Sequence, residues 1–254
     1  MRNPHGDFIW YELMTRDAAA AERFYGPILG WKIGESMPGD VDYRMIVAGD
    51  ENAGGALTLT DEMCEHGAHP TWLAYIGVDD VDATVAQMEQ KGGSVLMPAT
   101  DYPGVGRMAM VSDPQSLPFY VMRGLSDETS TVFSVEKTGH VAWNELVTSD
   151  LGAAKTFYTQ VFGWSLGGAM PMGPLGDYQF LEHGGQMIGA MMQSPNEGQR
   201  GWNFAFNCAD IDGAVGQIST LGGTVRDGPM EVPGGQRVIQ ATDPEGTRFM
   251  LVGK

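Results

Sequence analysis

The chain has 254 residues, enough to bury a substantial core in one or two domains. Its apolar fraction of 43% and charged fraction of 19% are those of a folded globular protein and exclude a disordered chain. Fifteen Lys and Arg against 32 Asp and Glu give a net charge of −17. Such a surface repels nucleic acid and anionic membranes and favours cationic ligands at long range, although a charge kept for solubility is the simpler explanation.

Cysteine usage and the N-terminus indicate a cellular compartment. The two cysteines, Cys64 and Cys208, form no spaced framework, and Cys208 lies inside an apparent strand, as a buried thiol would. The N-terminal residues contain no apolar core of a signal peptide, and no apolar run is long enough to span a bilayer. We therefore expect a cytoplasmic protein, either a monomer or a homodimer.

The sequence contains an internal duplication. Residues 6–31 match residues 139–164 at 12 of 26 positions, and residues 71–95 match 201–225 at 8 of 25. The repeat predicts a first half over residues 1–125, a polar linker over 126–138 and a second half over 139–254.

In chain order, each half divides again into two similar units. Residues 8–15 alternate between two faces as a strand does, and the following helix over 17–30 has Asp17 as its N-cap and ends at Gly30. Three short strands follow, separated by Gly, Pro and Asp turns. Residues 71–123 repeat this order of strand, helix and three strands. The sequence therefore predicts four βαβββ modules and an α+β fold.

This order resembles the vicinal oxygen chelate superfamily, which includes glyoxalase I, extradiol dioxygenases and bleomycin-resistance proteins. The resemblance rests on the paired Phe-Tyr and Gly-Trp motifs of the helices and on the Asp-Pro turn before the last strand of each half. In detail the chain is similar to tandem glyoxalase-like proteins of actinobacteria, of the 27-kDa-antigen type. The resemblance implies that each half curls its strands into an open barrel around a concave site.

In metal-using members of this superfamily, His, Gln or Glu side chains from the inner strands hold a divalent ion. The resemblance places these positions at Trp10, Leu73 and Tyr120 in the first half, with a fourth among residues 56–58. In the second half it places them at Trp143, Asn203 and Met250, with a fourth among residues 190–192. None of these is a carboxylate or an imidazole, so we expect no metal cofactor, and a divalent metal only if the register differs by one residue.

The five histidines do not suggest another metal site. His66 and His69 lie in a turn-rich link, and His5, His140 and His183 are separated from one another in the sequence. We interpret all five as solvated loop residues, of which His140 stands directly before the first strand of the second half.

Strand alternation places Trp10 and Glu12 on the same inner face, and likewise Trp143 and Glu145. A carboxylate in an apolar hollow needs a hydrogen bond or an ion pair, and desolvation there would make it a general acid or base. Glu12 and Glu145 are therefore the candidate catalytic residues. The alternative is that a neighbouring Tyr or Arg, with Arg107 and Arg237 as candidates, fixes each carboxylate in a structural role.

Other candidate ligand-binding residues lie on the same inner faces. The tryptophans could form stacking walls or fill the hollow. The second half is the more polar, because Asn203 and Asn207 replace Leu73 and Gly77 on one strand. The further candidates are Tyr43, Tyr75, Tyr120, Tyr178, Gln240 and Met250.

These observations leave three hypotheses. The first is a metal-independent glyoxalase-like protein that binds a small organic molecule, cationic or aromatic, in one or both hollows. The second is an enzyme, either a metal-dependent lyase, isomerase or dioxygenase or a metal-free enzyme with Glu12 or Glu145 as its general base. In the third, one half has become purely structural.

Overall fold

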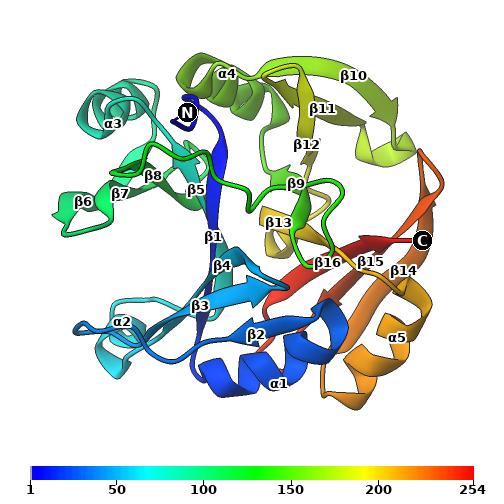
Figure 1. The fold of residues 1–254 in the computed structure, drawn as a ribbon. Helices are drawn as coiled ribbons and strands as arrows, with labels where there is room; N and C mark the ends of the chain where they lie inside the picture. The colour runs from blue at the N-terminus through cyan, green and yellow to red at the C-terminus, as the bar shows by residue number, and fades with distance from the viewer. Residues whose placement is uncertain (1) are drawn as a thin grey trace. The chain divides into compact units, whose positions relative to one another are not determined.

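The structure is a computed structural model, and it describes residues 2–254 except for the side chain of residue 197. Figure 1 shows the strands and helices of both halves, which follow the predicted order of one strand, one helix and three strands in each module. The first half contains β1 (Phe8–Thr15), α1 (Ala18–Leu29), β2 (Trp31–Ile33), β3 (Tyr43–Ala48), β4 (Glu51–Thr58), α2 (Asp61–Glu65), β5 (Thr71–Gly77), α3 (Val81–Gln90), β6 (Ser94–Tyr102), β7 (Gly106–Ser112) and β8 (Pro118–Gly124).

The second half repeats the eight strands and the two long helices, has the short 3₁₀ turn η2 where the first half has α2, and adds the 3₁₀ turn η1. It contains β9 (Val141–Thr148), α4 (Leu151–Phe162), β10 (Ser165–Pro171), η1 (Gly173–Leu175), β11 (Asp177–His183), β12 (Gln186–Gln193), η2 (Glu197–Gln199), β13 (Gly201–Asn207), α5 (Ile211–Thr220), β14 (Thr224–Val232), β15 (Gln236–Thr242) and β16 (Arg248–Gly253). The four predicted βαβββ modules are confirmed. No helix in the described part of the chain is both long enough and apolar enough to cross a membrane.

The module helices start and stop where the sequence predicts. The carboxylate of Asp17 accepts a hydrogen bond of 2.9 Å from the backbone N–H of Ala20, and Asp150 caps α4 in the same way. Gly30 and Gly163 then take left-handed conformations, with φ of 73° and 69°, and end the two helices.

The strands form two eight-stranded sheets with identical topology. Their orders are β2-β3-β4-β1-β5-β8-β7-β6 and β10-β11-β12-β9-β13-β16-β15-β14. In the first sheet β1 runs parallel to β4 and β5 parallel to β8, whereas the outer pairs are antiparallel. Neither strand order returns to its starting edge, so both sheets are open, as the prediction of an α+β fold with curled, unclosed halves requires.

The compact units of the fold combine modules from different halves. One unit, here unit 1, comprises residues 1–9, 73–130 and 144–202, and the other, unit 2, comprises residues 10–72, 131–143 and 203–254. Unit 2 therefore packs the first module of the first half with the last module of the second half. The predicted boundaries at 125 and 139 follow the duplication in the sequence, and we keep them as a proposal for the domains.

A buried hydrogen bond joins the two modules in each unit. In unit 2 the hydroxyl of Tyr25, on α1, donates to Asp243 Oδ2 at 3.0 Å. In unit 1 the hydroxyl of Tyr158, on α4, donates to Asp113 Oδ2 at 3.1 Å. Burial raises the pKa of both carboxyl groups above the ordinary value of 3.8, against the opposing effect of their hydrogen bonds.

A second contact repeats in each unit. In unit 1 the indole N–H of Trp164 donates to the carbonyl of Gly6 at 2.8 Å, and in unit 2 Trp31 donates in the same way to Gly139. Gly6 and Gly139 have positive φ values of 98° and 79°. A Cβ at Gly139 would lie 2.9 Å from Trp31 Nε1, so glycine is required at this point by both conformation and space.

Replacing Asp243 with Asn should change the pH dependence of stability. A carboxyl whose pKa is raised by folding binds more protons in the folded state, so its contribution to stability is complete below its unfolded pKa and is lost as pH rises through the folded value. The free energy of unfolding of the wild type minus that of Asp243→Asn should therefore fall as pH rises from 3.8 to the raised pKa of the folded state. The fall should be up to about 1.4 kcal/mol per pH unit between these two pKa values. Urea unfolding at several pH values measures it, with the exposed Asp40→Asn as a control. A difference that rises with pH would contradict this account of Asp243.

Candidate functional site

The inner face of β1 carries Trp10, whose orientation is fixed by a hydrogen bond. Its indole Nε1 donates to the hydroxyl of Tyr43, on β3, at 2.7 Å. The register places Gly55 of β4 opposite Glu12, and a Cβ at Gly55 would overlap the Tyr43 hydroxyl. Glycine at this position therefore lets the Tyr43 ring lie directly over β4, where it holds the indole. Glu12 itself is buried, at 2% exposure.

The matched strand of the second half holds its carboxylate through a tyrosine. Tyr178, on β11, donates its hydroxyl hydrogen to Glu145 Oε2 at 2.9 Å. Glu145 is 8% exposed, so this hydrogen bond supplies a polar partner in a site that is largely shielded from water. Of the two partners that the sequence suggested for this carboxylate, the structure supplies the tyrosine.

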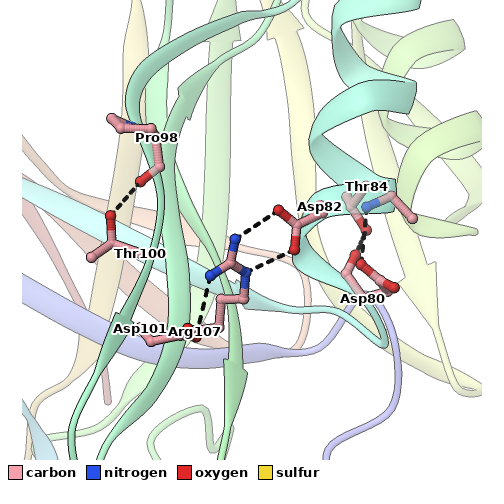
Figure 2. Close-up of polar contacts among 8 residues, drawn as sticks. Asp80, Asp82, Thr84, Pro98, Thr100, Asp101 and Arg107 are labelled. Atoms are coloured by element: carbon pink, nitrogen blue, oxygen red, sulfur yellow. Dashed lines mark hydrogen bonds and ion pairs between the residues drawn. The ribbon is translucent and has the colours of Figure 1, made fainter.

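The prediction that Arg107 and Arg237 fix the two glutamates is wrong. Figure 2 shows the Arg107 guanidinium between Asp82 and Asp101, with Nε and Nη2 each 2.7 Å from an Asp82 oxygen. Arg237 makes the same bidentate pair with Asp212. The guanidinium lowers the pKa of Asp82 below its ordinary value. Each helix thus offers a carboxylate in its first turn, near enough to pair with the arginine of the neighbouring strand.

The inner positions of β5 and β8 are aromatic in unit 1. Tyr75 and Tyr120 are register neighbours, and their rings stack with centroids 4.3 Å apart and planes 14° apart. The Tyr120 hydroxyl lies 4.0 Å from the Sδ of Met97, a residue that sequence reasoning did not single out. Only the register of β6 against β7 and β8 could have placed Met97 there. Both tyrosines are buried, so they form a packed aromatic layer.

The same register positions are filled differently in unit 2. Ala205 and Met250 replace the stacked tyrosines as neighbours on β13 and β16. They belong to a buried apolar cluster with Ala142, against which the partly exposed Trp143 packs. Gln240 is the register neighbour of Met250 and is exposed. The structure therefore brings Trp143, Met250 and Gln240 to one region, while Asn203 lies two residues before Ala205 on β13, at 9% exposure.

One predicted polar residue, Asn207, is engaged elsewhere. The Asn207 amide donates to the carbonyls of Ser134 and Lys137 at 3.1 and 3.2 Å, so it holds the segment that leads into β9.

The interpretation of the histidines as solvated loop residues holds for His66 and His69, which are exposed. It is wrong for His183, which lies on a strand, and the two remaining histidines lie in loops but are not freely solvated. His140 is buried beside the carbonyl of Thr131, His183 lies on β11 with Nε2 3.2 Å from Asp7, and His5 Nε2 lies 2.9 Å from the Val161 carbonyl. Burial lowers the pKa of His140.

The residues at the positions that the resemblance assigns to metal ligands do not fit a divalent ion. In unit 2 these positions carry an indole that donates its N–H to Tyr43, a second indole, an amide and a thioether, and in unit 1 they carry Leu73 and Tyr120. Divalent ions of this class require several imidazole nitrogens or carboxylate oxygens around one point. Among residues 2–254, no three His, Cys, Asp or Glu side chains gather in a group that could hold an ion.

Comparison with curated proteins identifies full-length relatives. The chain is 30% identical over 245 residues to the "Putative glyoxylase CFP32" of Mycobacterium tuberculosis, an alignment that covers 96% of this chain and 93% of the relative. It is 30% identical over 273 residues to the "Anthracycline biosynthesis protein DnrV" of Streptomyces peucetius, with 96% and 91% covered.

Solved structures share the fold at low identity. The 2,3-dioxygenase LapB from Pseudomonas sp. KL28 superposes with a TM-score of 0.67 at 16% identity, covering 100% of this chain and 94% of that chain. The Mn(II)-bound glyoxalase from Novosphingobium aromaticivorans gives 0.66 at 15% identity, covering 100% and 83%. The family model described as Glyoxalase/Bleomycin resistance protein/Dioxygenase superfamily matches twice, over residues 8–118 and 137–251. The chain belongs to the glyoxalase/bleomycin resistance protein/dioxygenase superfamily and carries two copies of its domain.

Proposed function

We propose that this protein binds a small, planar organic molecule on the inner strand faces without a resident divalent metal, and that the second half provides the principal site. The observation that carries the proposal is the partial exposure of Trp10 and Trp143, which stand at the positions where the resemblance described above implies a ligand to the ion. An indole cannot coordinate a cation through its N–H, but its face binds planar and cationic groups.

The exposure of these two indoles supports a role in binding. Trp31, Trp72 and Trp164 are buried in the core at 3% exposure each. Trp10 and Trp143, in contrast, remain partly exposed although they lie on buried strands. Trp202 is also partly exposed, but its ring packs against the core rings of Phe8, Tyr158 and Trp164. A partly exposed indole on an inner strand face, fixed by packing or by a hydrogen bond, is suited to stack on a ligand.

The second half is favoured because its inner wall is smaller and more polar. In unit 1 the stacked rings of Tyr75 and Tyr120 occupy the inner positions of β5 and β8. The matching positions in unit 2 are Ala205 and Met250, and a thioether adapts its shape to a ligand more readily than a phenol does. Gln240 adds a group that can donate and accept hydrogen bonds beside Met250.

Charge and relatives indicate the kind of molecule. The net charge of −17 favours a ligand with a positive group at long range, and the face of the Trp143 indole binds cationic groups. One relative is named as an anthracycline biosynthesis protein, and anthracyclines are built on planar fused rings. A fused-ring aromatic compound with an amino substituent therefore fits the proposal best.

Elemental analysis tests the metal-independent part. Protein purified without chelator, and a sample reloaded with Mn²⁺ or Fe²⁺ and then desalted, should both contain much less than one equivalent of metal per chain, because the available donors are indole, phenol, amide and thioether groups. A stoichiometric ion that survives desalting and raises the melting temperature would overturn this part of the proposal.

Tryptophan replacement tests the binding site. Isothermal titration with an amino-substituted anthraquinone as the probe should show a Kd about tenfold weaker for Trp143→Leu than for the wild type, because stacking and cation–π contacts of this kind contribute about 1–2 kcal/mol. Trp10→Leu should have a smaller effect.

Leu166→Ala, an exposed strand position, is the control and should leave the Kd unchanged. Equal affinity in all three variants would place the bound probe away from both indoles and would contradict the proposed site.

A further inference from the structure

A separate cavity of about 400 Å³ lies on unit 1, beside the β6–β7 turn, the start of β7 and the end of β8. Its lining includes Arg2, Arg107, Arg123, Asp101, Tyr102 and Leu125. A smaller cavity of about 50 Å³ adjoins it and shares Arg2 and Arg123 as lining residues. Three of the chain's 15 basic residues thus line one hollow in a protein of charge −17.

Arg107 and Arg123 are direct register neighbours on β7 and β8. Like charges in this position destabilise a sheet unless something negative lies between or beside them. Arg107 is satisfied by Asp82 and Asp101, as Figure 2 shows. Arg123 makes a weaker pair, with Nη1 3.7 Å from Asp79, and its side chain is only 25% exposed.

Within residues 2–254, the guanidinium groups of Arg2 and Arg123 have N–H donors that make no ion pair or hydrogen bond. The pair between Arg123 and Asp79 engages one of five guanidinium N–H groups, and the pair between Arg2 and Asp127 engages Nε at 2.6 Å. The carboxylates of Asp79, Asp82 and Asp127 are not part of the cavity lining. The lining itself carries three guanidinium groups and one carboxylate, a formal charge of +2, and the three carboxylates paired with these arginines from outside the lining bring the whole group to −1.

The long-range field of the protein opposes an anion, but it does not decide local binding. At physiological ionic strength, charges more than about 8 Å apart are largely screened. A group inside the cavity therefore responds mainly to the lining arginines and to the acids paired with them. Those acids reduce the attraction, so we expect affinity in the micromolar to millimolar range rather than tighter binding.

The other side chains that line the cavity suit the organic part of a ligand. Tyr102 is 38% exposed and Leu125 is 66% exposed, and both border the cavity. The volume exceeds what a bare inorganic anion requires. An anion attached to a small apolar or aromatic group would therefore contact these side chains while its charged end met the arginines.

The matching region of unit 2 lacks the second arginine. Arg237 repeats the pair of Arg107, because it binds Asp212 bidentately and lies opposite Glu231. Its neighbour on β16, however, is Gly253, where β8 has Arg123. The duplicated module therefore provides an internal control for what Arg123 adds.

We propose that this cavity binds the phosphate monoester of a small organic molecule. A phosphate monoester carries a charge between −1.5 and −2 at neutral pH, opposite in sign to the charge of the lining, and its oxygens accept bidentate hydrogen bonds from guanidinium groups. The site is independent of the inner faces that carry Trp10 and Trp143, so it does not rest on the function proposed above.

Isothermal titration with phenyl phosphate tests the proposal. The wild type should bind it saturably, more tightly than inorganic phosphate, and more weakly as salt is raised. Arg123→Gln should weaken the Kd about tenfold or more, and Arg123→Lys should restore it only in part because an ammonium group cannot bind bidentately. Arg237→Gln removes the same charge from the matching position and should leave the Kd unchanged.

The melting temperature of each variant shows whether it is folded, and Arg123→Lys keeps the test valid if Arg123→Gln does not fold. Absence of saturable binding by the wild type up to about 10 mM, far weaker than the range expected, would overturn the proposal. Equal weakening by Arg123→Gln and Arg237→Gln would also overturn it, because binding would then follow net charge alone.

Discussion

A buried tyrosine–aspartate hydrogen bond is the contact on which the arrangement of the modules depends. Asp243 Oδ1 accepts the backbone N–H groups of Glu245 and Thr247, which shapes the turn before β16, while Oδ2 accepts the hydroxyl hydrogen of Tyr25. Asp113 does the same for the turn before β8 and for Tyr158. One carboxylate thus both forms a turn in one module and docks the helix of a module from the other half.

This constraint explains why the most faithful part of the duplication lies around the helix. The Phe-Tyr pair supplies the phenol, the following Gly-Trp supplies the indole that binds the backbone ahead of β1 or β9, and the Asp-Pro turn supplies the carboxylate. Removing one partner would leave a buried polar group without its hydrogen bond, at a cost of about 1–3 kcal/mol. The inner strand faces differ more between the two halves. Tyr75 and Tyr120 in one half correspond to Ala205 and Met250 in the other.

The secondary structure could be predicted from the sequence, whereas most of the contacts between side chains could not. Alternation and turn residues located the strands, and Asp17 and Gly30 marked the ends of the first helix, because these signals act within a few residues. The pairing of Arg107 with Asp82 depends on which strand lies beside the start of α3, and the sequence does not contain that register. For the same reason the burial of His140 was missed, since its environment is created by Thr131 and the neighbouring strands. At the candidate site, the residue types on the inner faces were readable, but the bond from Trp10 to Tyr43 and the stacking of Tyr75 on Tyr120 required the structure.

Separate expression of residues 1–130 and 131–254 would test the reciprocal packing most directly. Each fragment contains one module of each compact unit and lacks the partner of its own Tyr–Asp bond. The account predicts that neither fragment alone is a folded monomer, and that mixing them gives a one-to-one complex with the circular dichroism spectrum of the intact chain. Two fragments that are each monomeric, unfold cooperatively near the melting temperature of the whole protein and do not associate would contradict it.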